Sequence, residues 1–229
     1  MKSFSSRVKV MNVLLDVDGV LIRDPKILER TQNNIARYVG FKVPRAKDPV
    51  KLRDYLYRTY GHTGRGLRKT LGVPTPDFDV QLYDKSMMEQ LADYLTTDTF
   101  QKDAQVVRDL LNHGHYVSLF SNAPGMWTWP IACAIDLRLD IAKFAGYKPQ
   151  PVAYTHLRNG NPVVFVDDIR NNLLPIEHHP HWIPVHYKGE AAKGRITTIE
   201  RLDELPGLIE RTYAAWDKDG RVSHRPHRG

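Results

Sequence analysis

Two aspartates separated by one residue stand at the end of the first apolar run of this chain. The stretch VMNVLLDVDGVLI, residues 10–22, reads as a buried strand that ends at Asp16 and Asp18. Ionised carboxylates are costly to bury without compensation, and two on one face of a strand repel each other. A divalent cation or a shared proton would relieve this conflict. The alternative is turn chemistry, for which Asp18 followed by Gly19 is a typical pair.

Three further apolar runs resemble the first one. They are short, rich in β-branched and aromatic residues, and bounded by turn signals, at residues 115–123, 162–168 and 181–187. A helical pattern covers residues 100–115, and another, interrupted at Pro206, covers residues 197–216. Strands that alternate with helices predict an α/β fold with a Rossmann-like core of three layers around a parallel sheet.

Polar residues follow the first three apolar runs at the point where each run ends. Besides the two aspartates, they are Ser121, Asn122, Asp167 and Asp168. The carboxyl ends of parallel strands meet at one edge of the sheet, where active sites of such folds gather. We therefore expect these side chains to lie close together.

The pattern changes between residues 23 and 99. Strong strand signals are missing there, and helical periodicity dominates, as in residues 50–61 and 84–95. We expect residues 23–99 to form a helical cap domain inserted after the first strand, with residues 1–22 and 100–215 as the core. Residues 216–229 are basic and poor in apolar side chains, which predicts a disordered tail. Such a tail could contact nucleic acid weakly or simply keep the protein soluble.

The bulk composition bounds the classes of protein and partner. A formal net charge of +7 over 229 residues favours an anionic partner, such as a phosphorylated metabolite or nucleic acid. The single cysteine, Cys133, excludes an internal disulfide, and its apolar neighbours predict a core position. No apolar run approaches the roughly 18 residues of a membrane span. The first strand follows too soon for a signal peptide, so we expect a cytoplasmic protein without a membrane partner.

Four histidines near the last apolar run raise the possibility of a zinc site. They are His178, His179, His181 and His186. No cysteine or acidic cluster at ligand spacing accompanies them, so structural zinc is the weaker interpretation.

Taken together, four short motifs resemble those of the haloacid dehalogenase-like superfamily of phosphatases. DVDGV begins at Asp16, LFSNA contains Ser121, YKPQPVAY contains Lys148, and FVDDIRNN contains the pair that begins at Asp167. Lys148 lies 27 residues after Ser121 and 19 residues before Asp167, in the order of the family. The resemblance covers residues 10–188, and four ordered motifs are far more specific than a single pair of aspartates.

The resemblance implies a Mg²⁺-dependent phosphomonoester hydrolase with an aspartyl-phosphate intermediate. Asp16 would be the nucleophile, and Asp18 the general acid and base. The remaining roles are phosphate binding by Ser121, Asn122 and Lys148, and Mg²⁺ binding by Asp16, the backbone carbonyl of Asp18, and Asp167 and Asp168. Dehalogenase members of the superfamily lack the second aspartate of the first motif, so Asp18 argues against dehalogenation.

Taken singly, these motifs have less specific interpretations. Ser121 and Asn122 could form an ordinary helix cap, and Lys148 could lie in a solvated loop, with Lys143 as a competing basic residue. The pair that begins at Asp167 could form a turn at a strand end. Their joint occurrence favours the catalytic interpretation.

Residues 57–72, YRTYGHTGRGLRKTLG, resemble the cap of pyrimidine 5′-nucleotidase-like members of the superfamily. The shared element, Tyr-Gly-x-x-x-x-Gly-Leu, begins at Tyr60. This resemblance implies a nucleoside 5′-monophosphate as substrate, with contacts from Tyr57, Tyr60, His62 and Arg65. The alternative is that the tyrosines pack within a helix and the arginines form its solvated face.

Two other functions stay open at this point. A phosphatase of a small sugar phosphate or phosphoglycolate would carry the same core motifs, with the aromatic residues of the insert serving only for packing. A catalytically silent subunit with the same fold could instead bind RNA or a larger assembly through its basic tail.

Overall fold

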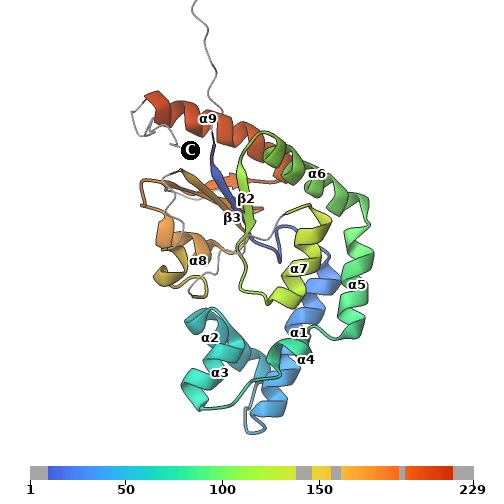
Figure 1. Ribbon diagram of the computed structural model, residues 1–229. Helices are drawn as coiled ribbons and strands as arrows, with labels where there is room; N and C mark the ends of the chain where they lie inside the picture. Colours follow the sequence, from blue (N-terminus) through green and yellow to red (C-terminus); the bar gives the residue numbers. More distant parts are fainter. Residues whose placement is uncertain (1–9, 138–145, 156–160, 191–193, 219–229) are drawn as a thin grey trace, which may run out of the picture.

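The computed structural model describes residues 10–137, 146–155, 161–190 and 194–218 (Figure 1). Five strands form one sheet in the order β2-β1-β3-β4-β5, and every neighbouring pair is parallel. The strands are β1 (Asn12–Leu15), β2 (Tyr116–Leu119), β3 (Val163–Asp167), β4 (Trp182–Tyr187) and β5 (Thr197–Ile199). The predicted α/β fold with a parallel sheet is confirmed.

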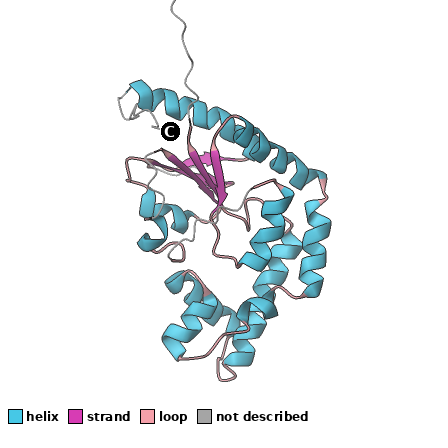
Figure 2. Ribbon diagram, in the orientation of Figure 1, coloured by secondary structure: helices cyan, strands magenta, loops and turns pink. Residues whose placement is uncertain are grey.

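The sheet is buried on both faces, as a parallel sheet requires. Because side chains alternate along a strand, Val13 and Leu15 join one hydrophobic cluster, whereas Leu14 joins another. The first cluster includes residues of α6 (Asp98–Asn112), α7 (Gly125–Ala134) and α9 (Leu205–Lys218). The second includes residues of α8 (Arg170–Leu173) and of the short 3₁₀ helices at Pro151–Tyr154 and Leu174–Ile176. Figure 2 shows the resulting order of helix, sheet and helix.

After the turn that follows β1, the chain up to β2 forms helices joined by loops and ends with α6. It contains α1 (Pro25–Lys42), α2 (Pro49–Tyr60), α3 (Thr63–Leu71), α4 (Phe78–Leu82) and α5 (Lys85–Leu95). An aspartate caps α1, α2 and α5, because Asp24, Asp48 and Asp84 each accept a backbone N–H from the first turn. The helical pattern expected for this segment is confirmed, and its status as a separate cap domain stays a prediction.

Two expectations about the end of the chain were wrong. Residues 197–199 form β5 and are not helical. Pro206 does not interrupt a helix, because it is the second residue of α9. A backbone N–H at that position has no acceptor within the helix, so its absence in proline costs no helical hydrogen bond. Since α9 continues to Lys218, the first three residues of the expected tail are helical. The other tail residues, from 219 onward, lie outside the described residues.

Cys133 is exposed, so its expected core position was also wrong. One face of α7 buries Trp127 and Ile131, and Cys133, two residues after Ile131, falls on the opposite face. The neighbouring sequence is apolar on all sides of the helix, so its pattern did not show which face is buried. None of the described helices has the length and apolar character needed to cross a membrane.

Candidate active site

The register of the sheet brings the ends of β1 and β3 side by side. Asp16 follows β1 directly, and its N–H donates to the carbonyl of Val166 at 2.9 Å. Asp167 is the last residue of β3. Carboxylate oxygens of Asp16, Asp167 and Asp168 all lie within 4.8 Å of one another, and they form the one group of three potential metal ligands in the described residues. The aspartates of the first and fourth motifs therefore belong to one site.

Lys148 reaches this group from the loop after α7. Its side chain is 1% exposed, and its Nζ lies 3.0 Å from Oδ1 of Asp16 and 2.5 Å from Oδ2 of Asp167. Burial lowers the pKa of the Lys148 ammonium, but the two carboxylates outweigh this effect and hold that pKa above its ordinary value. Lys148 is thus not a solvated loop residue. The competing Lys143 lies outside the described residues.

Asp167 is fully buried, and both of its oxygens already accept hydrogen bonds. Oδ2 faces Lys148, while Oδ1 accepts the backbone N–H of Ile169 at 2.8 Å. The side-chain amide of Asn172 lies 3.1 Å from Oδ1 and 3.0 Å from Oδ2. Burial raises the pKa of the Asp167 carboxyl, and the charge of Lys148 partly offsets that rise. Asp167 therefore anchors the lysine, with little capacity left for another ligand.

Asp168 presents the opposite case. Its Oδ1 is shielded from solvent and has no hydrogen-bond partner. Burial, followed by the charge of Asp16, raises the pKa of Asp168 to about 7. Gly19 makes room for this side chain: it has a φ of +87°, and a Cβ there would lie 2.1 Å from Oδ2 of Asp168.

The donor set of this edge fits a hard divalent cation. Such ions prefer carboxylate and carbonyl oxygens, and the described site holds an unpartnered buried carboxylate oxygen at Asp168, close to Asp16. The turn expected as an alternative also exists, because the N–H of Gly19 donates to the carbonyl of Ile22 at 2.9 Å. Turn and carboxylate site occur together in this stretch.

Within the part of the chain that the structure describes, the Asp18 carboxylate accepts a hydrogen bond from the indole of Trp127. The indole Nε1 donates to Oδ1 of Asp18 at 2.9 Å. Burial, followed by the charge of Asp16, raises the pKa of Asp18 to about 6, against opposing effects of Trp127 and Lys148. A carboxyl whose pKa approaches neutrality can both donate and accept a proton, which suits general acid and base chemistry.

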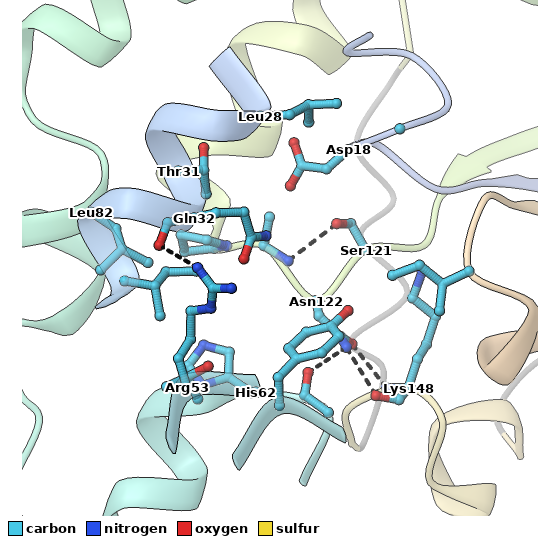
Figure 3. Close-up of a pocket in the computed structure, with 18 of the residues that line it drawn as sticks. Asp18, Leu28, Thr31, Gln32, Arg53, His62, Leu82, Ser121, Asn122 and Lys148 are labelled. Carbon is cyan, nitrogen blue, oxygen red and sulfur yellow. Dashed lines mark hydrogen bonds between the residues drawn. The ribbon is translucent and has the colours of Figure 1, made fainter. Parts of the chain in front are cut away.

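Ser121 and Asn122 follow β2 at the same edge of the sheet. The Oγ of Ser121 accepts the N–H of Ala123 at 3.1 Å and keeps its own proton available for donation (Figure 3). It does not cap α7, which begins after Pro124 without a side-chain cap. The helix-cap alternative therefore does not apply to Ser121.

The amide of Asn122 is fully occupied by the backbone of two other segments. Its Nδ2 donates to the carbonyls of Gly61 at 2.7 Å and Lys148 at 2.9 Å, and its Oδ1 accepts the N–H of Lys148 at 2.8 Å. Figure 3 shows the two donated bonds as dashed lines between Asn122, the turn before α3 and the Lys148 loop. Any contact of Asn122 with a phosphate would therefore come from its backbone N–H.

A cavity of about 260 Å³ connects this edge to the helices of the insert. Of the four substrate contacts expected in the insert, Tyr57 and His62 line it, whereas Tyr60 and Arg65 do not. The hydroxyl of Tyr60 bonds to Thr70 at 2.9 Å, and Arg65 donates to Oε1 of Gln150 at 2.6 Å. Tyr60 and Arg65 thus hold the insert together and hold it against the Lys148 loop.

His62 is fixed and uncharged at neutral pH. Its Nδ1 accepts the N–H of Arg65 at 3.1 Å as the cap of α3, so the ring proton lies on Nε2. The ring packs between Phe78 and Tyr147, with centroid distances of 5.0 and 4.6 Å. Burial, followed by the charges of Arg68 and Arg65, lowers the pKa of His62 to about 4. His62 can therefore offer a hydrogen-bond donor to the cavity without a positive charge.

Comparison with known proteins gives a fold but no sequence family. The sequence matches no protein-family model and no curated protein. Among solved structures, an L-2-haloacid dehalogenase matches with a TM-score of 0.51 at 14% identity, over 88% of this chain and 99% of its own. A phosphoserine phosphohydrolase-like protein from Francisella tularensis subsp. tularensis SCHU S4 matches with a TM-score of 0.54 at 16% identity, over 87% and 100%.

The chain has the haloacid dehalogenase-like fold. A hydrolase from Pseudomonas syringae also matches it, with a TM-score of 0.51 at 14% identity, over 87% of this chain and 98% of its own.

Within this haloacid dehalogenase-like fold, the motifs located the carboxylates and the lysine but missed the residues that position them. Trp127 and Asn172 are two of these, and Arg53 is a third residue that was missed, on the cavity wall. Arg53 donates to Oδ1 of Asp54 at 2.7 Å. It also donates to the carbonyl of Gln32 at 3.0 Å (Figure 3). It lies one helical turn before Tyr57 on α2, so the spacing to a candidate residue was the one available signal.

Proposed function

We propose that the protein is a Mg²⁺-dependent phosphomonoester hydrolase that forms an aspartyl-phosphate at Asp16. The observation that carries this proposal is the meeting of Asp16, Lys148 and Asp168 at one sheet edge, with Ser121 and Asp18 lining the same cavity. A nucleophile, an acid, a hydroxyl donor and a fixed cation around one space are the groups that phosphoryl transfer requires. The similarity between the fold of this chain and the folds of solved hydrolases supports this proposal.

The proposed reaction has two displacement steps. An oxygen of Asp16 forms a bond to phosphorus, and the electron pair of the ester P–O bond goes to the leaving oxygen, which takes a proton from Asp18. Water then attacks phosphorus and gives a proton to Asp18, and the electron pair of the acyl phosphate bond returns to Asp16. The products are the alcohol and inorganic phosphate, and the enzyme is unchanged.

Lys148 and Ser121 are the proposed phosphate-binding side chains. Lys148 brings a buried positive charge next to the nucleophile, at 3.0 Å from Asp16. The hydroxyl proton of Ser121 and the backbone N–H of Asn122 can donate to phosphate oxygens, because the side-chain amide of Asn122 is already engaged. Donors fixed before the reaction stabilise developing charge without reorganisation.

Asp16, the backbone carbonyl of Asp18 and Asp168 are the proposed Mg²⁺ ligands. Asp168 is favoured over Asp167 because Asp167 already accepts hydrogen bonds at both oxygens, whereas Oδ1 of Asp168 has none. Magnesium, when bound, supplies positive charge that neutralises the carboxylates and the substrate phosphate. Asp167 would then act indirectly, by holding Lys148.

Nucleoside 5′-monophosphates are the proposed substrates within this class. Tyr57 and His62, two of the four expected contacts, line the cavity and can offer an aromatic face and a neutral donor. Small sugar phosphates and phosphoglycolate are the alternative, in which these two side chains serve only for packing. The catalytically silent subunit is the alternative from another class.

Release of inorganic phosphate across a substrate panel tests the proposal. The panel contains p-nitrophenyl phosphate, UMP, CMP, a hexose phosphate and phosphoglycolate, each with Mg²⁺ and with EDTA. We expect EDTA and Asp16→Asn each to abolish turnover, while the far-ultraviolet spectrum of Asp16→Asn stays that of the wild type. Activity on sugar phosphates without activity on UMP or CMP would contradict the nucleotide assignment. No Mg²⁺-dependent hydrolysis of any ester would contradict the proposed function and favour the silent subunit.

A further inference from the structure

Trp127 connects the helix α7 to the general acid of the proposed reaction. It is fully buried in the first turn of α7, and its ring stacks on Tyr83 of the insert, with centroids 4.7 Å apart and planes 29° apart. Its Nε1 donates to Oδ1 of Asp18 at 2.9 Å. Among the hydrogen bonds of the described residues, this is the one made to the Asp18 carboxylate. The side chain is thus held by one rigid donor.

The position of this donor determines which oxygen of Asp18 can transfer a proton. A carboxyl group rotates about its Cβ–Cγ bond, so an acid that must reach one substrate atom needs a fixed partner on its other oxygen. The indole is fixed by complete burial and by the stack with Tyr83. A bond from it to Oδ1 leaves Oδ2 for the cavity that Asp18 lines.

The backbone of Asp18 is fixed as well. The N–H of Gly19 donates to the carbonyl of Ile22, and Asp18 itself forms a β-bridge with Ile22. With the main chain held by this turn, rotation of the side chain is the remaining freedom of Asp18. The indole of Trp127 removes that freedom.

We propose that Trp127 is a positioning residue that orients Asp18 for proton transfer to the leaving oxygen. The inference rests on the proposed phosphatase function. An aliphatic alkoxide is a poor leaving group that needs a proton as it departs, whereas p-nitrophenolate departs without one. An acid aligned by a dedicated donor is useful only for the first kind of ester.

A purely structural interpretation accounts for the same bond. A buried indole N–H needs some acceptor, and Asp18 could be no more than that acceptor. The two interpretations differ in the response to the leaving group. Loss of a structural contact lowers the rate for all esters, whereas loss of alignment of the acid lowers it for esters whose leaving group needs the proton.

Trp127→Phe, which removes the indole N–H, separates these interpretations. The measured quantity is kcat/KM for UMP and β-glycerol phosphate, as alkyl esters, and for p-nitrophenyl phosphate. This parameter reports steps up to the first irreversible one, so the hydrolysis of the aspartyl-phosphate, common to all substrates, does not enter it. Trp129→Phe is the matched control, because Trp129 lies on the same helix and is 54% exposed.

We expect Trp127→Phe to lower kcat/KM for the alkyl esters about 10- to 100-fold, part of the full effect of a general acid. The value for p-nitrophenyl phosphate should change less than about threefold, and Trp129→Phe should change none of them. In an Asp18→Asn background, Trp127→Phe should have no further effect on the alkyl esters, because the two residues act as one unit.

Trp127→Phe also places a smaller ring in the core, which could lower activity through packing alone. A second variant therefore removes the N–H without changing the shape of the side chain. A benzothienyl side chain at position 127 keeps the shape of the indole and replaces its N–H with sulfur. It should reproduce the selective loss on alkyl esters. An equal loss on both classes of ester in either folded variant, or no loss on the alkyl esters, would overturn the role of Trp127 while leaving the phosphatase proposal intact. A wild-type protein that hydrolyses no ester overturns both.

Discussion

The Asp168→Asn substitution probes the charge balance of the proposed metal site through stability. Four carboxylates, those of Asp16, Asp18, Asp167 and Asp168, gather around one ammonium group in the described site. Oxygens of Asp16 and Asp168 lie within 4.8 Å of each other, and Oδ1 of Asp168 has no hydrogen bond that would be lost. At that distance and an effective dielectric constant of about 20, the repulsion is about 3 kcal/mol. The neutral amide removes this repulsion but also removes a ligand charge.

We therefore expect the effect of the substitution to change sign with Mg²⁺. With EDTA at pH 8, Asp168→Asn should raise the free energy of unfolding by about 1 to 3 kcal/mol, since the repulsion is relieved. At a Mg²⁺ concentration of 100 times its Kd, the wild type should gain about 2.7 kcal/mol. For a chain of this length, that gain corresponds to a rise in Tm of about 5 to 10 °C. The variant should show little or none of it.

Thermal and urea unfolding of the wild type and the variant, each with Mg²⁺ and with EDTA, give the four values needed. Asp93→Asn is the control, because Asp93 is an exposed aspartate on α5. It should leave the unfolding curve with EDTA unchanged, and also the shift of that curve when Mg²⁺ is added. A variant that is less stable than the wild type with EDTA would refute the repulsion argument. A variant that keeps the full Mg²⁺ shift would exclude Asp168 as a ligand.

Four further substitutions test how the insert is held. Gly61→Ala should destabilise the protein by at least about 2 kcal/mol in urea unfolding, because φ is +71° and a Cβ would lie 1.9 Å from the carbonyl of Lys148. Gly72→Ala, with φ +63° and no atom within 4 Å of its Cβ, should cost only about 1 kcal/mol, and equal costs would contradict the contact. Asn122→Ala removes three hydrogen bonds and should cost about 2 to 3 kcal/mol and lower kcat/KM; an effect on neither would refute its clamping role. His62 has a pKa of about 4 in the folded chain, below its unfolded value of 6.5, so its contribution to stability is complete above pH 6.5 and falls as the pH drops toward 4. His62→Asn, which keeps a capping acceptor, should remove about 2 kcal/mol of the stability difference between pH 7.5 and pH 5, and an unchanged difference would show that His62 is not buried as a neutral ring.

The sequence located those candidate site residues whose place in the fold follows from their position at the end of a strand. Asp16 and Asp167 follow apolar runs that are too short for helices, and the parallel sheet then brings strand ends together by geometry alone. Lys148 needed the family pattern, because nothing local distinguishes it from any other lysine before a proline. Trp127 gave no signal at all, since the group it orients lies 109 residues earlier in the chain.

The errors share a different cause, which is the choice of face on a short element. Cys133 lies in an apolar stretch, and only the packing of α7 decides that it points outward. Tyr60 and Arg65 were expected as substrate contacts from the same resemblance as Tyr57 and His62, but they do not line the cavity in the structure. The left-handed turn at Gly61 separates α2 from α3, so a single helical periodicity does not run through residues 57–65.

The contacts of Gly61 explain the Tyr-Gly pair at the start of the Tyr-Gly-x-x-x-x-Gly-Leu element, residues 60–67. The Gly61 turn lies so close to Lys148 that only a glycine fits, and Asn122 bonds to the backbone carbonyls of both. At this contact the insert meets the Lys148 loop through backbone atoms, which cannot distinguish one substrate from another. Under the proposed function, selectivity would rest on side chains that line the cavity, among them Tyr57 and His62. Since one amide bonds to the Gly61 turn and to the Lys148 loop, a displacement of the insert that keeps these bonds also displaces the Lys148 loop.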